Sequence, residues 1–156
     1  PDLRQNFPRS VFLGCAVNCG PNVWSKEHRD SMNRADGWCA ITALGHFDPR
    51  LGSHLLLCEL KLAIQFPAGS VILIPPATVA HANIPVAEGD ERASVVQFAT
   101  GGLFRFIDCS FMTEKDLAER EPELYAQKKA EKRHRWTNAL NNFSQLGDFS
   151  FSTATK

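Results

Sequence analysis

The sequence predicts a mainly β protein in which an antiparallel sandwich or barrel is followed by a helical segment. Short apolar runs separated by turn residues fill residues 38–100, no helical period interrupts them, and amphipathic helical spacing begins only at residue 113. The chain has 156 residues, which is the usual length of one domain. Hydrophobic residues make up 44% of it and charged residues 22%, a composition that excludes a wholly disordered chain.

Each predicted strand is a run rich in Val, Ile, Leu or Phe that is bounded by turn residues. The runs occupy residues 38–44, 54–60, 62–66, 70–74, 79–86 and 92–100. Pro, Gly and acidic residues at 48–49, 67–69, 75–76 and 88–90 supply the turns. Because the connections are too short for crossover helices, we expect the strands to pair antiparallel.

The helical segment follows residue 112. Thr113 with Asp116 resembles a capping box, and Pro122 is expected to end one helix or begin the next. Apolar residues then recur at helical intervals, at Leu117, Leu124, Tyr125, Trp136, Leu140 and Phe143. We therefore expect a core over residues 1–112, helices of the same domain over 113–148, and a frayed Ser/Thr-rich tail over 149–156.

Charge, cysteine content and the distribution of proline restrict the partners and the cellular compartment that the sequence allows. Lys and Arg number 17, and so do Asp and Glu, so the net charge is zero and any contact with a polyanion must come from a local patch. An odd number of cysteines, five, in apolar surroundings argues against a disulfide framework and for a reducing, intracellular compartment. Prolines interrupt the nearly uncharged stretch 62–83, so we expect no membrane span.

Two His-x-Asp pairs and a lone histidine are candidate metal ligands: His28 with Asp30, His46 with Asp48, and His81. Two histidines and one carboxylate form the facial triad that holds Fe(II) and leaves positions open for other ligands. In a double-stranded β-helix, the pair lies near the end of an early strand and the distal histidine on a late one. Four predicted strands separate Asp30 from His81, whereas His46 and Asp48 fall in a hairpin turn. We therefore assign the catalytic metal ligands to His28, Asp30 and His81.

A cosubstrate site is predicted at the start of the last strand. Arg92 begins that strand and Ser94 follows on the same face, so both side chains can point into the end of the barrel that contains His81. A guanidinium binds a carboxylate through two parallel hydrogen bonds, and a nearby hydroxyl adds another. This is the binding group that the distal carboxylate of 2-oxoglutarate requires.

Several segments together carry a family resemblance. They read Asn-Cys-Gly-Pro-Asn at 18–22, His-Arg-Asp-Ser-Met-Asn at 28–33 and Gly-Trp-Cys-Ala-Ile-Thr-Ala-Leu-Gly at 37–45, and the similarity continues at 52–55, 66–75, 81–83 and 101–105. The chain thereby resembles the TET/JBP-like 2-oxoglutarate and Fe(II)-dependent dioxygenases, in particular their expanded fungal (basidiomycete-type) branch. The resemblance covers about residues 15–145 and implies a double-stranded β-helix, the jelly-roll fold of cupins, with a C-terminal helical segment.

The resemblance implies oxidation of a methylated nucleobase in DNA, with 5-methylcytosine as the first substrate and N6-methyladenine as the competitor. Fe(II), 2-oxoglutarate and O2 would be the cofactor and cosubstrates. The base would be flipped out of the duplex, because its methyl group cannot reach a buried metal from within the stack. DNA modification or demethylation of this kind implies a nuclear or nucleocytoplasmic location.

Substrate-binding residues are expected beside the metal ligands. By resemblance Asn33 contacts the base, although it could equally cap the turn before Trp38. Arg29 faces away from the metal and would touch a phosphate or lie in water. One basic cluster could grip the DNA backbone or form a solvated helix face: Lys128, Lys129, Lys132, Arg133, His134 and Arg135.

Two other functions remain open: a 2-oxoglutarate oxygenase acting on a protein or small molecule, and a catalytically silent β-helix used for interactions. Only a short segment precedes His28, so we expect either a minimal member or one that lacks an N-terminal portion. Ser53 stands where the fungal pattern has Gly, and Cys58 stands where it has an aromatic residue.

Overall fold

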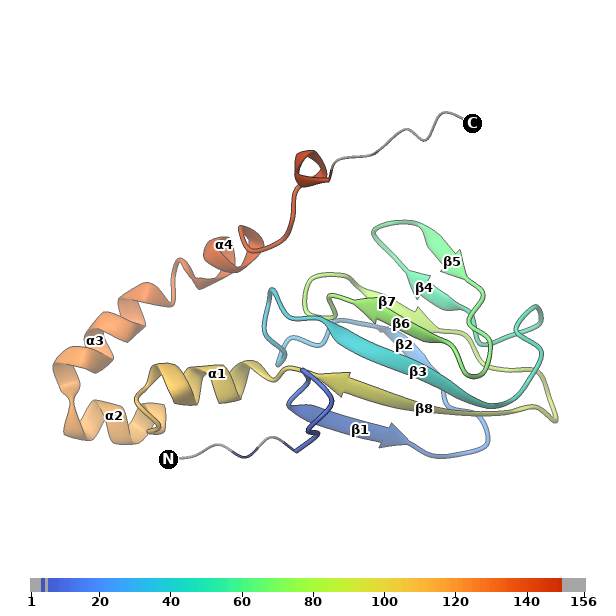
Figure 1. Cartoon of the computed structure of the whole chain (residues 1–156), viewed down its shortest axis with the longest axis horizontal. Coiled ribbons are helices and arrows are strands. Elements are labelled where there is room, and N and C mark those ends of the chain that lie inside the picture. The colour runs from blue at the N-terminus through green and yellow to red at the C-terminus, as the bar shows by residue number, and fades with distance from the viewer. Residues whose placement is uncertain (1–3, 5, 150–156) are drawn as a thin grey trace.

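The computed structural model describes residues 4 and 6–149, and this part of the chain forms eight strands followed by helices (Figure 1). The strands are β1 Gly14–Asn18, β2 Ser25–His28, β3 Cys39–His46, β4 Leu55–Leu57, β5 Leu62–Ile64, β6 Val71–Ile74, β7 His81–Asn83 and β8 Glu91–Phe98. The helices are α1 Gly101–Asp108, α2 Glu114–Arg120, α3 Pro122–Glu131 and α4 Arg135–Leu140, and the 3-10 turn η1 spans Leu146–Asp148.

The strands form two four-stranded sheets that face each other. One has the order β1-β8-β3-β6 and the other β2-β7-β4-β5, and every pairing in both is antiparallel. The chain passes back and forth between the sheets, as in a jelly roll. The architecture is therefore a double-stranded β-helix with C-terminal helices, which confirms the predicted fold class.

All six predicted strands are present, although most are shorter than expected. The sequence pattern missed β1 and β2, and β2 shows why: its residues, Ser-Lys-Glu-His, are mostly exposed and carry no apolar alternation. The helical part also begins earlier than residue 113. The side chain of Thr100 accepts a hydrogen bond from the backbone of Leu103 and starts α1 directly after β8, within the segment predicted as core.

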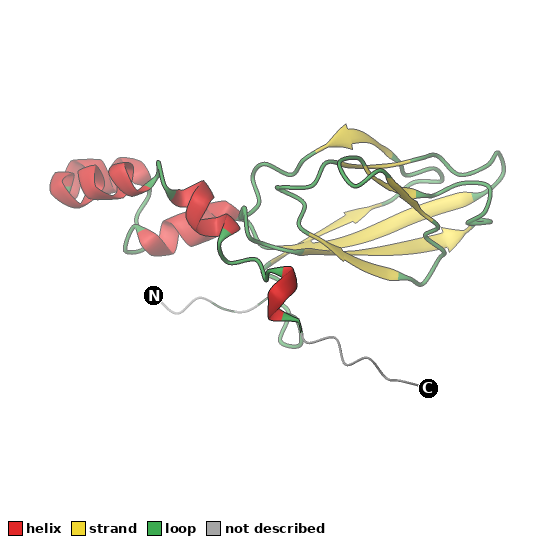
Figure 2. Cartoon of the chain, turned by 90° about the horizontal axis from the view of Figure 1, so that it is seen from above, coloured by secondary structure: helices red, strands yellow, loops and turns green. Residues whose placement is uncertain are grey.

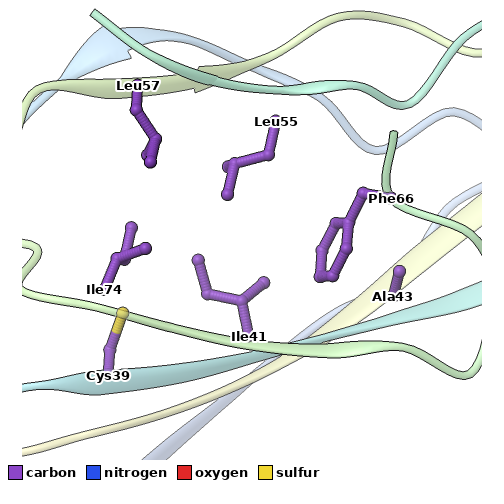
Figure 3. Close-up of a cluster of buried hydrophobic side chains, with 7 residues drawn as sticks. All are labelled: Cys39, Ile41, Ala43, Leu55, Leu57, Phe66 and Ile74. Atoms are coloured by element: carbon purple, nitrogen blue, oxygen red, sulfur yellow. The ribbon is translucent and has the colours of Figure 1, made fainter. Parts of the chain in front are cut away.

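The core lies between the two sheets (Figure 3). Alternate residues of β3 and β4 point inward from opposite sides, because successive side chains of a strand face opposite ways. The buried cluster consists of Cys39, Ile41, Ala43, Leu55, Leu57, Phe66 and Ile74. Burial raises the pKa of the Cys39 thiol to about 12, so this side chain packs as a small neutral hydrophobe.

Truncating the centre of this cluster should destabilise the protein strongly. Leu55 is fully buried, so we expect Leu55→Ala to lower the free energy of unfolding by about 2–5 kcal/mol through lost burial and the resulting cavity. Urea denaturation followed by circular dichroism measures this loss. Leu62→Ala is the matched control, since Leu62 on the neighbouring strand is 50% exposed and should change stability little. Equal losses in both variants would contradict the assigned core.

The helices lie beyond one end of the sheets in both views (Figures 1 and 2). The predicted cap of α2 is confirmed, because the Thr113 hydroxyl accepts from the backbone of Asp116 at 3.1 Å, and Pro122 begins α3. None of the described helices is long and apolar enough to cross a membrane. Apart from Phe149, the predicted frayed tail lies outside the described residues.

Candidate metal centre

The structure brings His28, Asp30 and His81 together at one end of the barrel. His28 ends β2 and His81 begins β7, and the two are direct cross-strand neighbours with ring centroids 4.4 Å apart. One ligand atom from each of the three residues lies within 4.8 Å of the other two. His28 Nε2 is 3.6 Å from Asp30 Oδ1. Two imidazoles and one carboxylate therefore converge on a point where a metal ion could bind.

Hydrogen bonds to the backbone orient both imidazole rings. Nδ1 of His28 lies 2.7 Å from the carbonyl oxygen of Lys26, and Nδ1 of His81 lies 3.0 Å from that of Val79. A carbonyl can only accept, so each Nδ1 carries the proton and each Nε2 keeps a lone pair for a metal. Burial lowers the pKa of His81, which also favours the neutral ring.

The other His-x-Asp pair does not belong to this group of candidate ligands. His46 ends β3, and Asp48 binds the guanidinium of Arg50 at 2.6 Å. Across the residues that the structure describes, one group of three His, Cys, Asp or Glu side chains has metal-ligand geometry, and it contains neither His46 nor Asp48. The roles of His28, Asp30 and His81 in catalysis stay predictions, but the geometry favours the pair that the strand spacing selected.

A cavity of about 560 Å³ opens from the three ligands into the barrel. Ser94, Val96 and Phe98 line one wall because alternate residues of β8 face inward. The cavity walls also include Asn33 and Asn83, and its other lining residues include the exposed side chains of Trp24 and Met32. A ligand at the metal position would thus contact both polar and apolar groups.

Arg92 lies on the inward face of β8, and its side chain is an isolated buried cation. The residue is 1% exposed, and burial lowers its pKa. Nε donates to Ser53 Oγ at 2.8 Å and Nη1 to the carbonyl oxygen of Val23 at 2.8 Å. Nη2 is buried and has no hydrogen-bond partner within the described part of the chain. A buried cation with a free donor fits a carboxylate ligand, which would supply both the charge and the acceptor.

Two serines lie in this part of the barrel, and one of them, Ser53, bonds Arg92 directly. Ser94 is buried on the same face of β8, lines the cavity and accepts from Asn18 Nδ2 at 3.0 Å. Ser53, the departure from the fungal pattern, adopts a left-handed φ of 61°, a conformation in which Gly is more stable. Its hydroxyl binds Arg92, which gives a physical reason for a serine at this strained position.

The predicted substrate residues lie close to the metal ligands. Asn33 Nδ2 donates to Asp30 Oδ2 at 3.4 Å, and its backbone N–H donates to the Asp30 carbonyl at 2.9 Å, so Asn33 steadies the carboxylate in a turn. Arg29 forms an ion pair with Glu59 and donates to the Thr78 carbonyl. Both residues line the cavity, and their contact with a substrate stays a prediction.

Sequence reasoning assigned no role to Asn83, and for His54 it favoured a solvent-facing or hydrogen-bonded structural role over a pocket-lining one; both residues carry buried polar atoms. Asn83 Nδ2 and His54 Nδ1 have no hydrogen-bond partner among the described residues. Asn83 lies two positions after His81 on β7, so strand alternation could have placed it on the same inward face. His54 directly follows Ser53, and the backbone of Ile84 donates to its carbonyl. Asn83 and His54 thus join Arg92 as residues with a buried side-chain polar atom that no hydrogen bond satisfies within the described part of the chain.

A second, basic cavity of about 620 Å³ lies beside α1. Arg105, Lys132 and Arg135 line it together with one acidic residue, Glu114. None of these three cations forms an ion pair within 4.0 Å in the described part of the chain, although Arg135 is close enough to Glu131 to help lower the pKa of that carboxyl. The predicted basic cluster is therefore divided: Lys132 and Arg135 face this cavity, whereas Lys128 pairs with Glu131. Arg105, which sequence reasoning missed, completes the cavity.

The chain shows weak, partial similarity to solved structures. No family model and no curated protein matches the chain. A viral collagen prolyl hydroxylase from Paramecium bursaria Chlorella virus-1, solved with 2OG, aligns with a TM-score of 0.41 and 18% identity, over 55% of this chain and 57% of that one. An RmlC-like cupin protein from Desulfovibrio desulfuricans aligns with a TM-score of 0.35 and 13% identity, over 63% of this chain and 97% of that one.

Proposed function

We propose that the chain is an Fe(II)- and 2-oxoglutarate-dependent dioxygenase. The observation that carries this proposal is the combination, in one barrel, of two imidazoles and a carboxylate at a common point with a buried arginine that lacks an anionic partner. His28, Asp30 and His81 would hold the iron, and Arg92 with Ser94 would hold the distal carboxylate of 2-oxoglutarate. The bound iron and cosubstrate, together with O2, supply the chemistry that hydroxylates a C–H bond.

The protein's own residues would bind and orient the reactants. The carbonyls of Lys26 and Val79 hold the two imidazoles with Nε2 directed at the metal position. Ser53 and Val23 hold the Arg92 side chain and leave Nη2 available for a carboxylate. Val96 and Phe98 would present apolar surface to a substrate in the cavity.

We further propose that the substrate is a methylated base in DNA, with 5-methylcytosine first and N6-methyladenine second. Three features support this proposal: the His-Arg-Asp-x-x-Asn string at 28–33, a cavity open to the surface, and a basic cavity next to it. The carbonyl of Met32, which lines the first cavity, accepts a hydrogen bond from the N–H of Gly101, the residue before Gly102 of the second cavity. A flipped base could enter the first cavity while Arg105, Lys132 and Arg135 contact backbone phosphates. A DNA substrate accords with a nuclear or nucleocytoplasmic location.

Nucleoside mass spectrometry tests this function directly. The full chain is incubated with Fe(II), 2-oxoglutarate and duplex oligonucleotides that carry 5-methylcytosine, N6-methyladenine or no modification, and both succinate and oxidised nucleosides are measured. We expect an oxidised base from one modified duplex, together with succinate above the level that the unmodified duplex gives. The reason is that a correctly bound methyl group couples cosubstrate turnover to product.

Other outcomes separate the competing functions. Succinate formation that DNA leaves unchanged would favour a protein or small-molecule substrate, for which the metal ligands and Arg92 serve equally well. No succinate under any condition with iron present would favour a catalytically silent interaction module. Either result would overturn the proposed DNA substrate, and the second would overturn the enzyme as well.

A further inference from the structure

We infer that the ion pair between Arg29 and Glu59, here named the clasp, positions the metal ligands Asp30 and His81. Arg29 is the residue between the first histidine and the carboxylate, and Glu59 lies in the turn between β4 and β5. The inference rests on the proposed iron site and is independent of which substrate is oxidised.

The clasp spans the strand that carries His81. In the sheet β2-β7-β4-β5, β7 lies between β2 and β4, and His28, His81 and Leu57 are cross-strand neighbours. Arg29 follows the end of β2, and Glu59 follows the end of β4. Because the strands are antiparallel, both ends lie where β7 begins. The two side chains therefore approach the start of β7 from opposite sides.

Each side chain of the clasp also binds the backbone that leads into β7. Arg29 Nη2 pairs with Glu59 Oε1, and Arg29 Nε donates to the Thr78 carbonyl at 3.2 Å. The N–H of Ala80 donates to Glu59 Oε2 at 2.8 Å. Both carboxylate oxygens are thus in use, and Ala80 immediately precedes His81. The clasp consequently ties the backbone next to the distal histidine to the residue next to the carboxylate ligand.

Backbone hydrogen bonds also join the segment 76–80 to the residues that follow β2 and β4. The N–H of Asp30 donates to the Pro76 carbonyl at 2.8 Å, and the N–H of Cys58 donates to the Ala80 carbonyl at 2.9 Å. The segment 76–80 is therefore held between the Asp30 turn and the Glu59 turn. Removing the clasp would leave these backbone bonds in place but would remove the bonds that its side chains make to the Thr78 carbonyl and to the N–H of Ala80, next to His81.

The solvent exposure of the clasp indicates that it positions the metal ligands rather than stabilising the fold. The side chains of Arg29 and Glu59 are 50% and 41% exposed, and water screens ion pairs of this kind, so they contribute little to overall stability. Groups that orient metal ligands, in contrast, commonly change metal affinity 10- to 100-fold when they are removed. The clasp should therefore affect metal affinity much more than the melting temperature.

The test measures Co(II) and anaerobic Fe(II) binding to the full chain and to its variants. We expect Glu59→Gln to weaken metal binding about tenfold, to alter the visible spectrum of bound Co(II), and to leave the melting temperature of the metal-free protein unchanged. Arg29→Ala should give a similar loss, and the double variant should lose no more than either single variant, because the two residues act as one unit.

Asp48→Asn is the matched control. It breaks the exposed ion pair between Asp48 and Arg50, which lies outside the metal centre, and should leave metal binding unchanged. If Arg29→Ala does not fold, Arg29→Lys replaces it and should show an intermediate loss, because a single ammonium cannot reproduce the fork that reaches both Glu59 and Thr78.

Three results would overturn the inference: wild-type affinity in Glu59→Gln, an equal loss in Asp48→Asn, or a loss that follows a fall in melting temperature. A wild-type chain that binds neither Co(II) nor Fe(II) would instead overturn the proposed iron site itself. The failure of the clasp and the failure of the proposed function are therefore distinguishable.

Discussion

The variant His81→Ala is expected to abolish Fe(II) binding and all 2-oxoglutarate turnover. His81 is 5% exposed, and its Nδ1 is held by the Val79 carbonyl, so Nε2 is the ring atom that His81 can offer to a metal. Without it, one imidazole and one carboxylate would remain, and these are too few for the facial triad. Anaerobic titration with Fe(II), or with Co(II) as a spectroscopic substitute, measures the loss directly.

His46→Ala provides the control for this experiment. His46 is exposed at the end of β3 and belongs to the His-x-Asp pair that lies outside the metal centre. Iron affinity should therefore be unchanged. Unchanged affinity in His81→Ala, or a loss confined to His46→Ala, would show that the ligands have been wrongly assigned.

Arg92→Ala is expected to weaken 2-oxoglutarate binding about 10- to 100-fold, since a hydrogen bond to a charged group contributes about 1.5–3 kcal/mol. Iron affinity should stay close to that of the wild type, because Arg92 is not one of the three metal-ligating residues. Titration of 2-oxoglutarate into the iron-loaded protein, together with the KM for 2-oxoglutarate, measures the effect. The variant should also melt at a lower temperature, because it leaves a cavity and frees Ser53 Oγ.

Ser53→Gly separates the cosubstrate effect from the loss of stability. Glycine adopts the left-handed φ of position 53 without strain, but the variant lacks the hydroxyl oxygen that accepts a hydrogen bond from Arg92 Nε. We expect a smaller loss of 2-oxoglutarate affinity than in Arg92→Ala and a smaller fall in melting temperature, because relief of the left-handed φ offsets part of the lost hydrogen bond. If both variants bind 2-oxoglutarate as the wild type does, the buried arginine is not the carboxylate site.

Local sequence patterns were enough to predict the fold class and most strands. The runs at 38–44 and 70–74 became β3 and β6 because each is a short apolar stretch bounded by Pro or Gly. The cap at Thr113 was equally readable, because its hydroxyl bonds a residue three positions away. β2 could not be predicted, since its polar residues pair through the backbone with β7, a strand far along the chain.

The sequence by itself determined the two candidate His-x-Asp pairs, the distal histidine and the arginine on the last strand, because residue type and strand spacing are local properties. Strand spacing also favoured His28 with Asp30 over the other pair, and the tertiary structure brings these two residues to His81. Only the tertiary structure decided which hydroxyl accepts a hydrogen bond from Arg92 and that Arg29 pairs with Glu59. Those choices depend on sheet register, which places residues dozens of positions apart in direct contact. A short pattern along the chain carries no information about such distant partners.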